Sequence, residues 1–286
     1  MTETGADSIP AITEQDASGE IAALYADLRI TLGVPFVNLI WRHLATIPGG
    51  LAWTWTLVKP LYLSGELDRL SVETAARAGL PSLTRWPDFV WEGVAIDRGA
   101  RRLIARLIDG YNRANGVNFL ALLAAVSVLR DGMPARLDTG RALPWANRPL
   151  VATDALPPLP KLSELSPPLL ALVRRLDQFG RLGSSDAIAS LYLHLALWPP
   201  FLSIAYTSLE PLHRSGELAK IQQGVIAFGR QQAFGLAGLV DRNLPAIAPE
   251  NRAAVLRPLD EFTCLMIGRM IVMGKAMHGL VSGDDG

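Results

Sequence analysis

Cysteine is nearly absent from this chain, since Cys264 is the single one among 286 residues. One thiol cannot form an internal disulfide framework, nor can it supply the paired cysteines of a C-x-x-C redox motif or a structural zinc site. Chains without disulfides are typical of reducing compartments, so the sequence predicts a cytoplasmic protein. Cys264 itself is interpreted as a small buried hydrophobe, because no histidine or asparagine is visibly arranged to activate it.

Net charge is lacking too. The chain has 27 Lys and Arg against 27 Asp and Glu, and its basic residues form no run. Charge-driven binding to nucleic acid or to anionic membranes needs a basic patch, so neither partner is expected. The N-terminal stretch MTETGADSIPAITEQD lacks the basic and then apolar order of a signal peptide. The apolar stretch at residues 187–209 is interrupted by WPP and is interpreted as buried core.

Motifs for common cofactors and metals are missing as well. The sequence contains no G-x-S-x-G elbow and no Walker loop, which gives serine hydrolysis and nucleotide binding no support. Its four histidines show neither H-x-x-x-H nor H-E-x-x-H spacing. We therefore expect no metal and no organic cofactor, and a small molecule as the partner.

The apolar residues recur at helical spacing, and no alternating strand pattern stands out. Two such stripes are Ile21, Leu24, Tyr25, Leu28 and Leu32, and Phe119, Leu122, Leu123, Val126 and Leu129. An all-α fold follows. The stretch YNRANGVNF at residues 111–119 is predicted to be a turn between two helices, with Asn118 as the N-cap. The serine of SGEL, at 64–67 and again at 215–218, is predicted to cap the helix that begins there.

An internal repeat is the strongest pattern in the sequence. Residues 38–67 align without a gap on residues 189–218, a shift of 151, and the aligned segments share HLA and SGEL. Upstream segments match at a shift of 148. The repeat predicts two helical units, residues 1–130 and 169–286, which pack as an internal pseudo-dimer. The proline-rich residues 131–168 are predicted to link them. With 50% hydrophobic residues, the chain could bury one large core or two small ones, and two are expected.

Two histidines occupy equivalent places in this repeat, His43 and His194. A catalytic group is rarely needed in both copies, whereas a packing group is. We therefore interpret each imidazole as a structural group that bonds a neighbouring backbone carbonyl or the opposite copy.

Methionines also recur at helical spacing near the C-terminus. They are Met266, Met270, Met273 and Met277. Such a stripe is most often core packing, and the alternative left open is a deformable pocket wall.

Several stretches together resemble the group I (D,L-) 2-haloacid dehalogenases, the DehI-type family. They are ADLRITLGVPFVNLIWRHLATIPG, YNRAN before a long apolar helix, the proline-rich linker, and a second helical copy that contains S-x-Y followed by LALWP. The resemblance covers nearly the whole chain. It implies an all-α pseudo-dimer whose active site lies between the copies and hydrolyses small 2-halo acids of either configuration without a cofactor. In that family an aspartate activates a water for direct displacement of halide at the α-carbon, and an asparagine helps to hold the water.

The resemblance carries over unevenly, residue by residue. The water-holding asparagine falls on Asn115, and the serine that precedes the aspartate falls on Ser190. The aspartate itself falls on Leu191, and the tyrosine three residues after the asparagine falls on Asn118. A leucine can neither take a proton from water nor orient it. Its repeat partner, Ile40, is apolar as well and predicts pocket lining at this position.

Asp186 is the substitute considered for the missing base. If residues 186–191 were helical, a rotation of about 140° would point Asp186 away from the family's carboxylate, so the base interpretation needs a later helix start. GSSD before an apolar run is also an ordinary helix N-cap, and that interpretation is preferred.

Two functions therefore remain open. The first is a cofactor-free hydrolase of small 2-substituted carboxylic acids, in which Asp186 is the base and Asn115 holds the water. The second is a member that binds a small apolar or carboxylate ligand without turnover. In both, we expect an apolar pocket between the copies, and a homodimer is an open possibility. The expected substrate-binding residues of this pocket are Ser190, Leu191, Tyr192, Trp41 and Asn118.

Overall fold

The computed structural model describes residues 9–134, 157–184, 187–244 and 247–282, and within those ranges the chain is helical without a strand. The predicted all-α fold is therefore confirmed. The first half contains α1 (Gly19–Leu32), α2 (Leu39–Leu44), α3 (Gly50–Leu63), α4 (Glu66–Arg77), α5 (Asp88–Gly93) and α6 (Arg98–Asp131). The second contains η1 (Leu162–Glu164), α7 (Pro167–Leu176), α8 (Ser190–Leu195), α9 (Pro199–Arg214), α10 (Glu217–Ala237), α11 (Pro249–Glu261), η2 (Phe262–Ile267) and α12 (Gly268–Val281).

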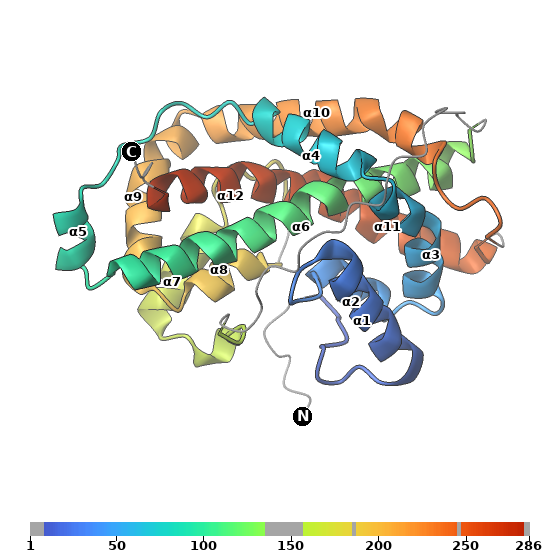
Figure 1. The fold of residues 1–286 in the computed structure, drawn as a ribbon, viewed down its shortest axis with the longest axis horizontal. Coiled ribbons are helices and arrows are strands. Elements are labelled where there is room, and N and C mark those ends of the chain that lie inside the picture. Colours follow the sequence, from blue (N-terminus) through green and yellow to red (C-terminus); the bar gives the residue numbers. More distant parts are fainter. Residues whose placement is uncertain (1–8, 135–156, 185–186, 245–246, 283–286) are drawn as a thin grey trace.

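The long helix α6 forms the centre of the molecule. It packs against α10 and α12 from the second half and against α4 from the first, and these helices run side by side in Figure 1. Nearly every residue of α6 from Ala114 to Val126 is buried. The buried apolar side chains of both halves form one continuous cluster. The expectation of two small cores is thus wrong, because the halves bury their helices against each other.

The stretch YNRANGVNF is not a turn. Helix α6 runs through it without a break for 34 residues, and its N-cap is Asp97, whose side chain accepts from the Ala100 N–H. Asn118, predicted to be an N-cap, lies in the helix interior. Asparagine and glycine disfavour a helix by at most about 1 kcal/mol each, which is less than the burial of this segment supplies.

Helix starts in the two halves recur at the spacing of the sequence repeat. From Leu39 to Ser190, from Glu66 to Glu217, and from Arg98 to Pro249, the offset is 151 residues. Helix α1 and helix α7 begin 148 residues apart, at Gly19 and Pro167. These offsets agree with two copies of one unit. That the copies superpose about a twofold axis stays a prediction of the sequence.

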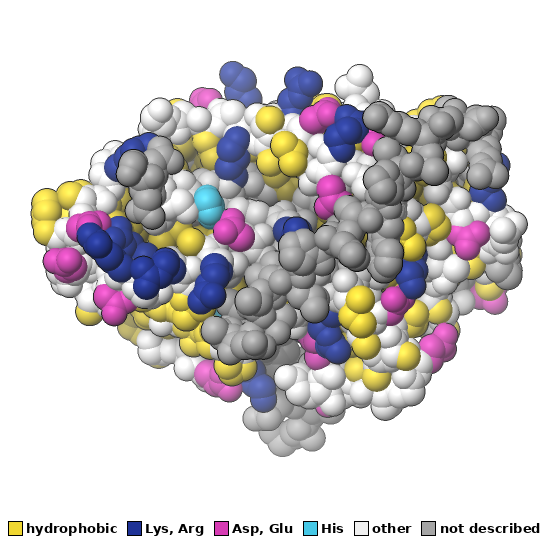
Figure 2. Space-filling view, in the orientation of Figure 1, with side chains coloured by type: hydrophobic (Ala, Val, Ile, Leu, Met, Phe, Trp, Pro, Cys, Tyr) yellow, Lys and Arg dark blue, Asp and Glu magenta, His cyan; other side chains and the backbone are white. Residues whose placement is uncertain are grey.

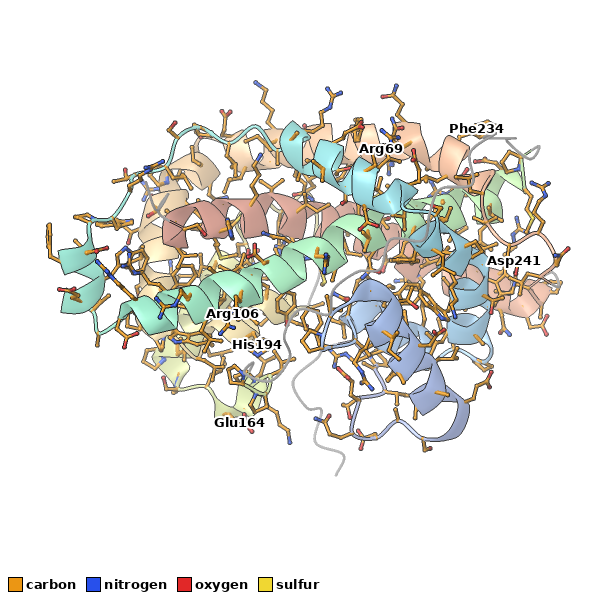
Figure 3. All side chains as sticks on the ribbon, in the orientation of Figure 1. Arg69, Arg106, Glu164, His194, Phe234 and Asp241 are labelled. Atoms are coloured by element: carbon orange, nitrogen blue, oxygen red, sulfur yellow. The ribbon has the colours of Figure 1, made fainter. Side chains whose placement is uncertain are left out.

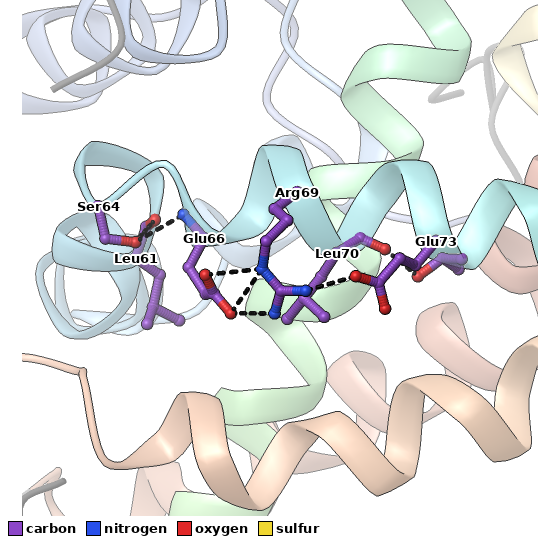
Figure 4. Close-up of polar contacts among 7 residues, drawn as sticks. Leu61, Ser64, Glu66, Arg69, Leu70 and Glu73 are labelled. Atoms are coloured by element: carbon purple, nitrogen blue, oxygen red, sulfur yellow. Dashed lines mark hydrogen bonds and ion pairs between the residues drawn. The ribbon is translucent and has the colours of Figure 1, made fainter. Parts of the chain in front are cut away.

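A helix begins at each SGEL segment, and the serine accepts a backbone N–H of its first turn. The N-cap residue of α4 is Gly65, with φ +75°, and not Ser64 as predicted. Ser64 Oγ nevertheless accepts the N–H of Glu66 at 3.1 Å, so it satisfies a first-turn amide from one position earlier (Figure 4). Arg69 then pairs with Glu66 and Glu73 along the exposed face of the same helix (Figure 4).

Two helical stretches are long and apolar enough to cross a membrane, Arg98–Asp131 and Pro249–Val281. Of their most apolar windows, 83% and 72% are buried inside the protein. Buried core helices pass the same test of length and composition, and the packing of α6 and α12 accounts for their apolar character. Charged side chains of both signs are interspersed on the face of the molecule in Figure 2.

Candidate functional site

A small pocket lies where α2, α6, α8 and the η2–α12 segment meet. Its volume is about 30 Å³. The polar residues that line it are Asn38, Tyr111, Asn115 and Ser190. The rest of the lining is apolar and includes Leu39, Ile40, Leu191, Phe262, Met266 and Met270. Free space of this volume holds roughly one or two waters. A mostly apolar lining with a few polar groups is the kind that binds a small organic molecule.

The structure brings Asn115 and Ser190 together, as the resemblance implied. Asn115 lies on α6 and is 6% exposed, and Ser190 is the first residue of α8. Among the described residues, the side-chain amide of Asn115 has no hydrogen-bond partner, which leaves it available to a ligand or a water. Leu191, at the place of the family's aspartate, lines the same pocket.

Pocket residues from the two halves are related by the repeat. The repeat partners of Ser190 and Leu191 are Leu39 and Ile40, and both line the pocket, as expected. On the long helices, Tyr111 has Phe262 as its partner and Asn115 has Met266. Aligned positions of both halves therefore surround the cavity. Three of these pairs have one polar member, and Leu191 and Ile40 are both apolar.

Trp41, Tyr192 and Asn118 do not line the pocket, which corrects the expected lining. Each is fully buried behind it. In α8, two residues after Ser190 correspond to a rotation of about 200°, which directs Tyr192 into the core instead.

Asn118 is the centre of a buried hydrogen-bond group. Its Oδ1 accepts from Trp41 Nε1 at 3.2 Å and from the Tyr62 hydroxyl at 2.6 Å. Its Nδ2 donates to Asn38 Oδ1 at 3.0 Å. Asn118 thus supports a pocket residue although it does not reach the pocket itself.

The two repeat-related histidines bond backbone carbonyls, as predicted. His43 Nδ1 lies 2.7 Å from the carbonyl oxygen of Pro10, and His194 Nε2 lies 2.6 Å from that of Pro157. Since a carbonyl only accepts, the nitrogen facing it carries the proton. His194 Nδ1 is then free to accept from the Tyr111 hydroxyl, 3.3 Å away.

His194 therefore ties a pocket-lining tyrosine to the chain before η1, and Figure 3 shows it beside α6. Burial lowers the pKa of His194, and the bond to the Pro157 carbonyl offsets part of that effect. Its role is structural, since it does not line the pocket.

Asp186 lies outside the described residues. Its neighbours from 187 to 189 are not helical, and the N-cap of α8 is Ala189. The preferred interpretation of Asp186 as an N-cap is therefore wrong. The late helix start that the base interpretation required is present.

A buried ion cluster holds the chain just before α8. Asp177, which is fully buried, accepts through Oδ1 from Arg269 at 2.8 Å and from the Ala189 N–H at 3.2 Å. Arg181 pairs with the other carboxylate oxygen. Because Ala189 and Ser190 both line the pocket, this cluster fixes one wall of it.

The described lining contains no carboxylate, histidine, cysteine, lysine or arginine. Tyr111 is its one titratable group, and burial raises the pKa of that hydroxyl above its usual range. In the part of the chain that the structure describes, no three acidic, histidine or cysteine side chains come close enough to hold a metal ion. The lining seen can position and polarise a ligand or a water but cannot take a proton.

The methionine stripe divides between the two interpretations. Met266 and Met270 line the pocket, whereas Met273 and Met277 are completely buried core.

The pocket wall at Phe262–Ile267 is a π-helix, a local widening that leaves a carbonyl without its usual partner. Gln222 Nε2 donates to the carbonyl of Cys264 at 3.1 Å and satisfies it from α10.

The chain is similar to a protein of known activity over most of its length. It is 25% identical over 238 residues to a 2-haloacid dehalogenase, configuration-inverting, from Alcaligenes xylosoxydans xylosoxydans, covering 80% of this chain and 78% of that protein. No family model matches this chain.

Solved structures of D-2-haloacid dehalogenase have the same fold as this chain. A complex of D-2-haloacid dehalogenase with L-LA superposes with a TM-score of 0.82 at 17% identity, over 96% of this chain and 97% of that one. A mutant of D-2-haloacid dehalogenase with D-2-CPA gives a TM-score of 0.75, with the same identity and coverage. The all-helical fold is therefore that of a haloacid dehalogenase.

The sequence interpretation missed Asn38, Tyr111 and Phe262 as site residues. Tyr111 could have been found because it precedes Asn115 by one helical turn. Phe262 could then have been found by the shift of 151, because it is the repeat partner of Tyr111. Asn38 has no such signal, since its repeat partner is Ala189.

Proposed function

We propose that this protein hydrolyses the carbon–halogen bond of small 2-halo carboxylic acids, without a metal or an organic cofactor. The observation that carries the proposal is the meeting of Asn115 and Ser190, from segments 75 positions apart, in one small apolar pocket. The sequence similarity to a 2-haloacid dehalogenase supports this reaction class.

The proposed reaction is a direct displacement at the α-carbon. The oxygen of a water forms the new C–O bond, the C–halogen bond breaks, and the halide leaves with the electron pair. The side-chain amide of Asn115, which has no partner in the described part of the chain, would hold the water, as the family's asparagine does. The proton of the water must pass to a base, and Asp186 is the residue proposed for this role because residues 187–189 are not helical and α8 begins only at Ser190.

The pocket favours a short acid. Aliphatic, methionine and aromatic side chains suit the alkyl part and the halogen, while Ser190 and the amides suit the carboxylate end. We further propose the group I type, which acts on both configurations, and a cytoplasmic location for a chain with a single cysteine.

A binding protein without turnover is the second candidate. It is favoured by Leu191, which puts an apolar side chain where the family has its catalytic carboxylate, in a described lining that holds no base. The same pocket would then hold a small acid and leave it unchanged.

Chloride release from each enantiomer of 2-chloropropionate separates the two candidates. Turnover in the wild type that falls by on the order of 10²–10⁴-fold in Asp186→Asn supports the hydrolase with Asp186 as base. Turnover that survives Asp186→Asn contradicts that assignment.

An inert wild type favours the binding protein. In that case Leu191→Asp is the informative replacement, since it restores a carboxylate beside Asn115 and Ser190. Activity gained in this variant shows that the pocket is still shaped for the displacement.

A further inference from the structure

The amide of Asn38 has a fixed orientation, set by buried neighbours. Trp41 Nε1 can only donate a hydrogen bond, so the atom of Asn118 that faces it must be Oδ1. The Tyr62 hydroxyl donates to the same oxygen at 2.6 Å. The opposite end of the Asn118 side chain is therefore its NH₂ group, which can only donate.

This donor determines which end of Asn38 is occupied. Asn118 Nδ2 lies 3.0 Å from Asn38 Oδ1, so the oxygen of Asn38 is used inside the protein. Its Nδ2 has no partner among the described residues. Asn38 lines the pocket and is half-buried, so the polar atom it can offer to the cavity is a hydrogen-bond donor.

The pocket around this donor has no cation. No lysine, arginine or histidine belongs to its described lining. A carboxylate that leaves water for such a site requires several hydrogen bonds from neutral donors. Asn38 Nδ2 and the Ser190 hydroxyl are suitable, and they come from opposite halves of the chain, at the beginnings of α2 and α8.

We propose that Asn38 binds the carboxylate of the small 2-substituted acid, with its amide held in the donor orientation by Asn118. The inference rests on the proposed function and adds a specificity-determining residue to it. It leaves Asn115 for the water. The hydrophobic Ala189, which is the repeat partner of Asn38, gives the pocket one carboxylate end and not two.

The test is a binding measurement that does not depend on turnover. Isothermal titration calorimetry compares 2-hydroxypropionate, the product of the proposed reaction, with its neutral amide, lactamide. Asn38→Asp has nearly the same shape, still accepts from Asn118, and replaces the donor by a negatively charged acceptor. We expect it to weaken binding of 2-hydroxypropionate by on the order of 10- to 100-fold, while lactamide binding stays within about threefold.

Two further variants complete the design. Asn38→Ala removes the donor without adding charge and should also weaken binding of the acid more than that of the amide. Asn243→Asp, an exposed position with the same change of charge, is the matched control and should bind like the wild type.

The outcomes separate this inference from the proposed function. If wild type, Asn38→Asp and the control bind 2-hydroxypropionate equally, Asn38 is not the carboxylate donor, although the acid pocket stands. If Asn38→Asp weakens both ligands equally, the effect is structural and the inference is wrong. If the wild type binds neither ligand, the acid pocket and the inference fail together.

Discussion

Among the described residues, Asp177 is the one buried carboxylate. It is fully buried, it receives two arginines, and it accepts the N–H of Ala189 at the pocket wall. Removing one partner of a buried ion pair leaves an uncompensated charge, which typically costs about 3–5 kcal/mol. We expect Arg269→Met to destabilise the protein by about 3 kcal/mol, because Arg181 still compensates Asp177 in part. Urea denaturation measures the free energy of unfolding.

An exposed ion pair provides the control for this prediction. Arg257 pairs with Glu261 at 2.9 Å, but its side chain is 81% exposed. Arg257→Met should leave the free energy of unfolding close to that of the wild type, because solvent screens an exposed ion pair. Equal effects of the two replacements would show that the buried cluster does not stabilise the fold.

His194 makes stability depend on pH. Because burial lowers its pKa in the folded protein, the unfolded chain takes up a proton first as the pH falls. Its contribution is therefore present above about pH 6.5, the ordinary value, and is lost as the pH falls below it. We expect the stability advantage of the wild type over His194→Gln to shrink between pH 7 and pH 5, measured by urea denaturation at each pH.

The opposite dependence is expected at His278. The hydrogen bond to Asp109 raises its pKa, so its contribution is full below about pH 6.5 and is lost as the pH rises through the raised value. His278→Gln should therefore lose its destabilising effect at high pH.

For His194, the opposite result would be a stability advantage of the wild type over His194→Gln that grows as the pH falls. That result would contradict the lowered pKa assigned to His194.

At the residue scale, the sequence predicted correctly the residues whose place follows from an alignment or from the internal repeat. The alignment of Asn115 and Ser190 placed both in one pocket, and the repeat predicted carbonyl bonds for His43 and His194. It failed where helix rotation decides. Tyr192 follows a pocket residue by two positions and turns into the core, and its direction depends on where α8 begins.

At the scale of elements, the crossing of α6 and α10 depends on one glycine. A Cβ built on Gly229 of α10 would lie 2.3 Å from the ring of Phe119 and 2.8 Å from Leu123, both on α6. Both side chains are buried in the core. We expect Gly229→Ala to destabilise the protein by about 1–3 kcal/mol or more, measured by the midpoint and slope of urea unfolding.

The same helix contains the matched control. Gly224 is exposed, and a Cβ there would meet nothing within 4 Å. Gly224→Ala lowers the conformational entropy of the unfolded chain and should stabilise the protein by about 0.5–1 kcal/mol. The prediction fails if the two alanine variants change stability in the same direction.

Helix type was predictable from apolar spacing, but helix continuity was not. The Asn and Gly residues at 115–118 locally favour a turn, and the structure runs α6 through them. Burial of this segment against helices from the other half outweighs the local preference. A single sequence does not contain that information, because the partner helices lie about a hundred residues away.

At the scale of the whole molecule, the repeat was visible in the sequence, whereas the single core was not. Recurring helix starts follow from aligned residues. The joining of both halves into one core follows from α6, whose buried face contacts α10 and α12 rather than its own half alone. Internal symmetry in a sequence therefore indicates two copies of a unit, but not that each copy folds independently.

The single core predicts that neither half is stable alone. A fragment of residues 1–134 would expose the face of α6 that α10 and α12 cover, and a fragment of residues 157–286 would expose the faces of those two helices. Each fragment loses apolar burial, which stabilises a fold by about 25 cal/mol per Å². A typical domain is stable by only about 5–15 kcal/mol, so it cannot lose the burial of a whole helix face. We expect each fragment to melt without a cooperative transition, and an equimolar mixture to regain one, by circular dichroism and size-exclusion chromatography.

The crossing at Gly229 makes the fragment experiment specific. A C-terminal fragment with Gly229→Ala should complement the N-terminal fragment poorly, because its alanine would meet Phe119 of the partner fragment. The same fragment with Gly224→Ala should complement normally. If a half melts cooperatively alone near the melting temperature of the intact chain, the halves are independent domains. In that case the pocket where α2, α6, α8 and the η2–α12 segment meet would lie at an interface between two domains and not within one core.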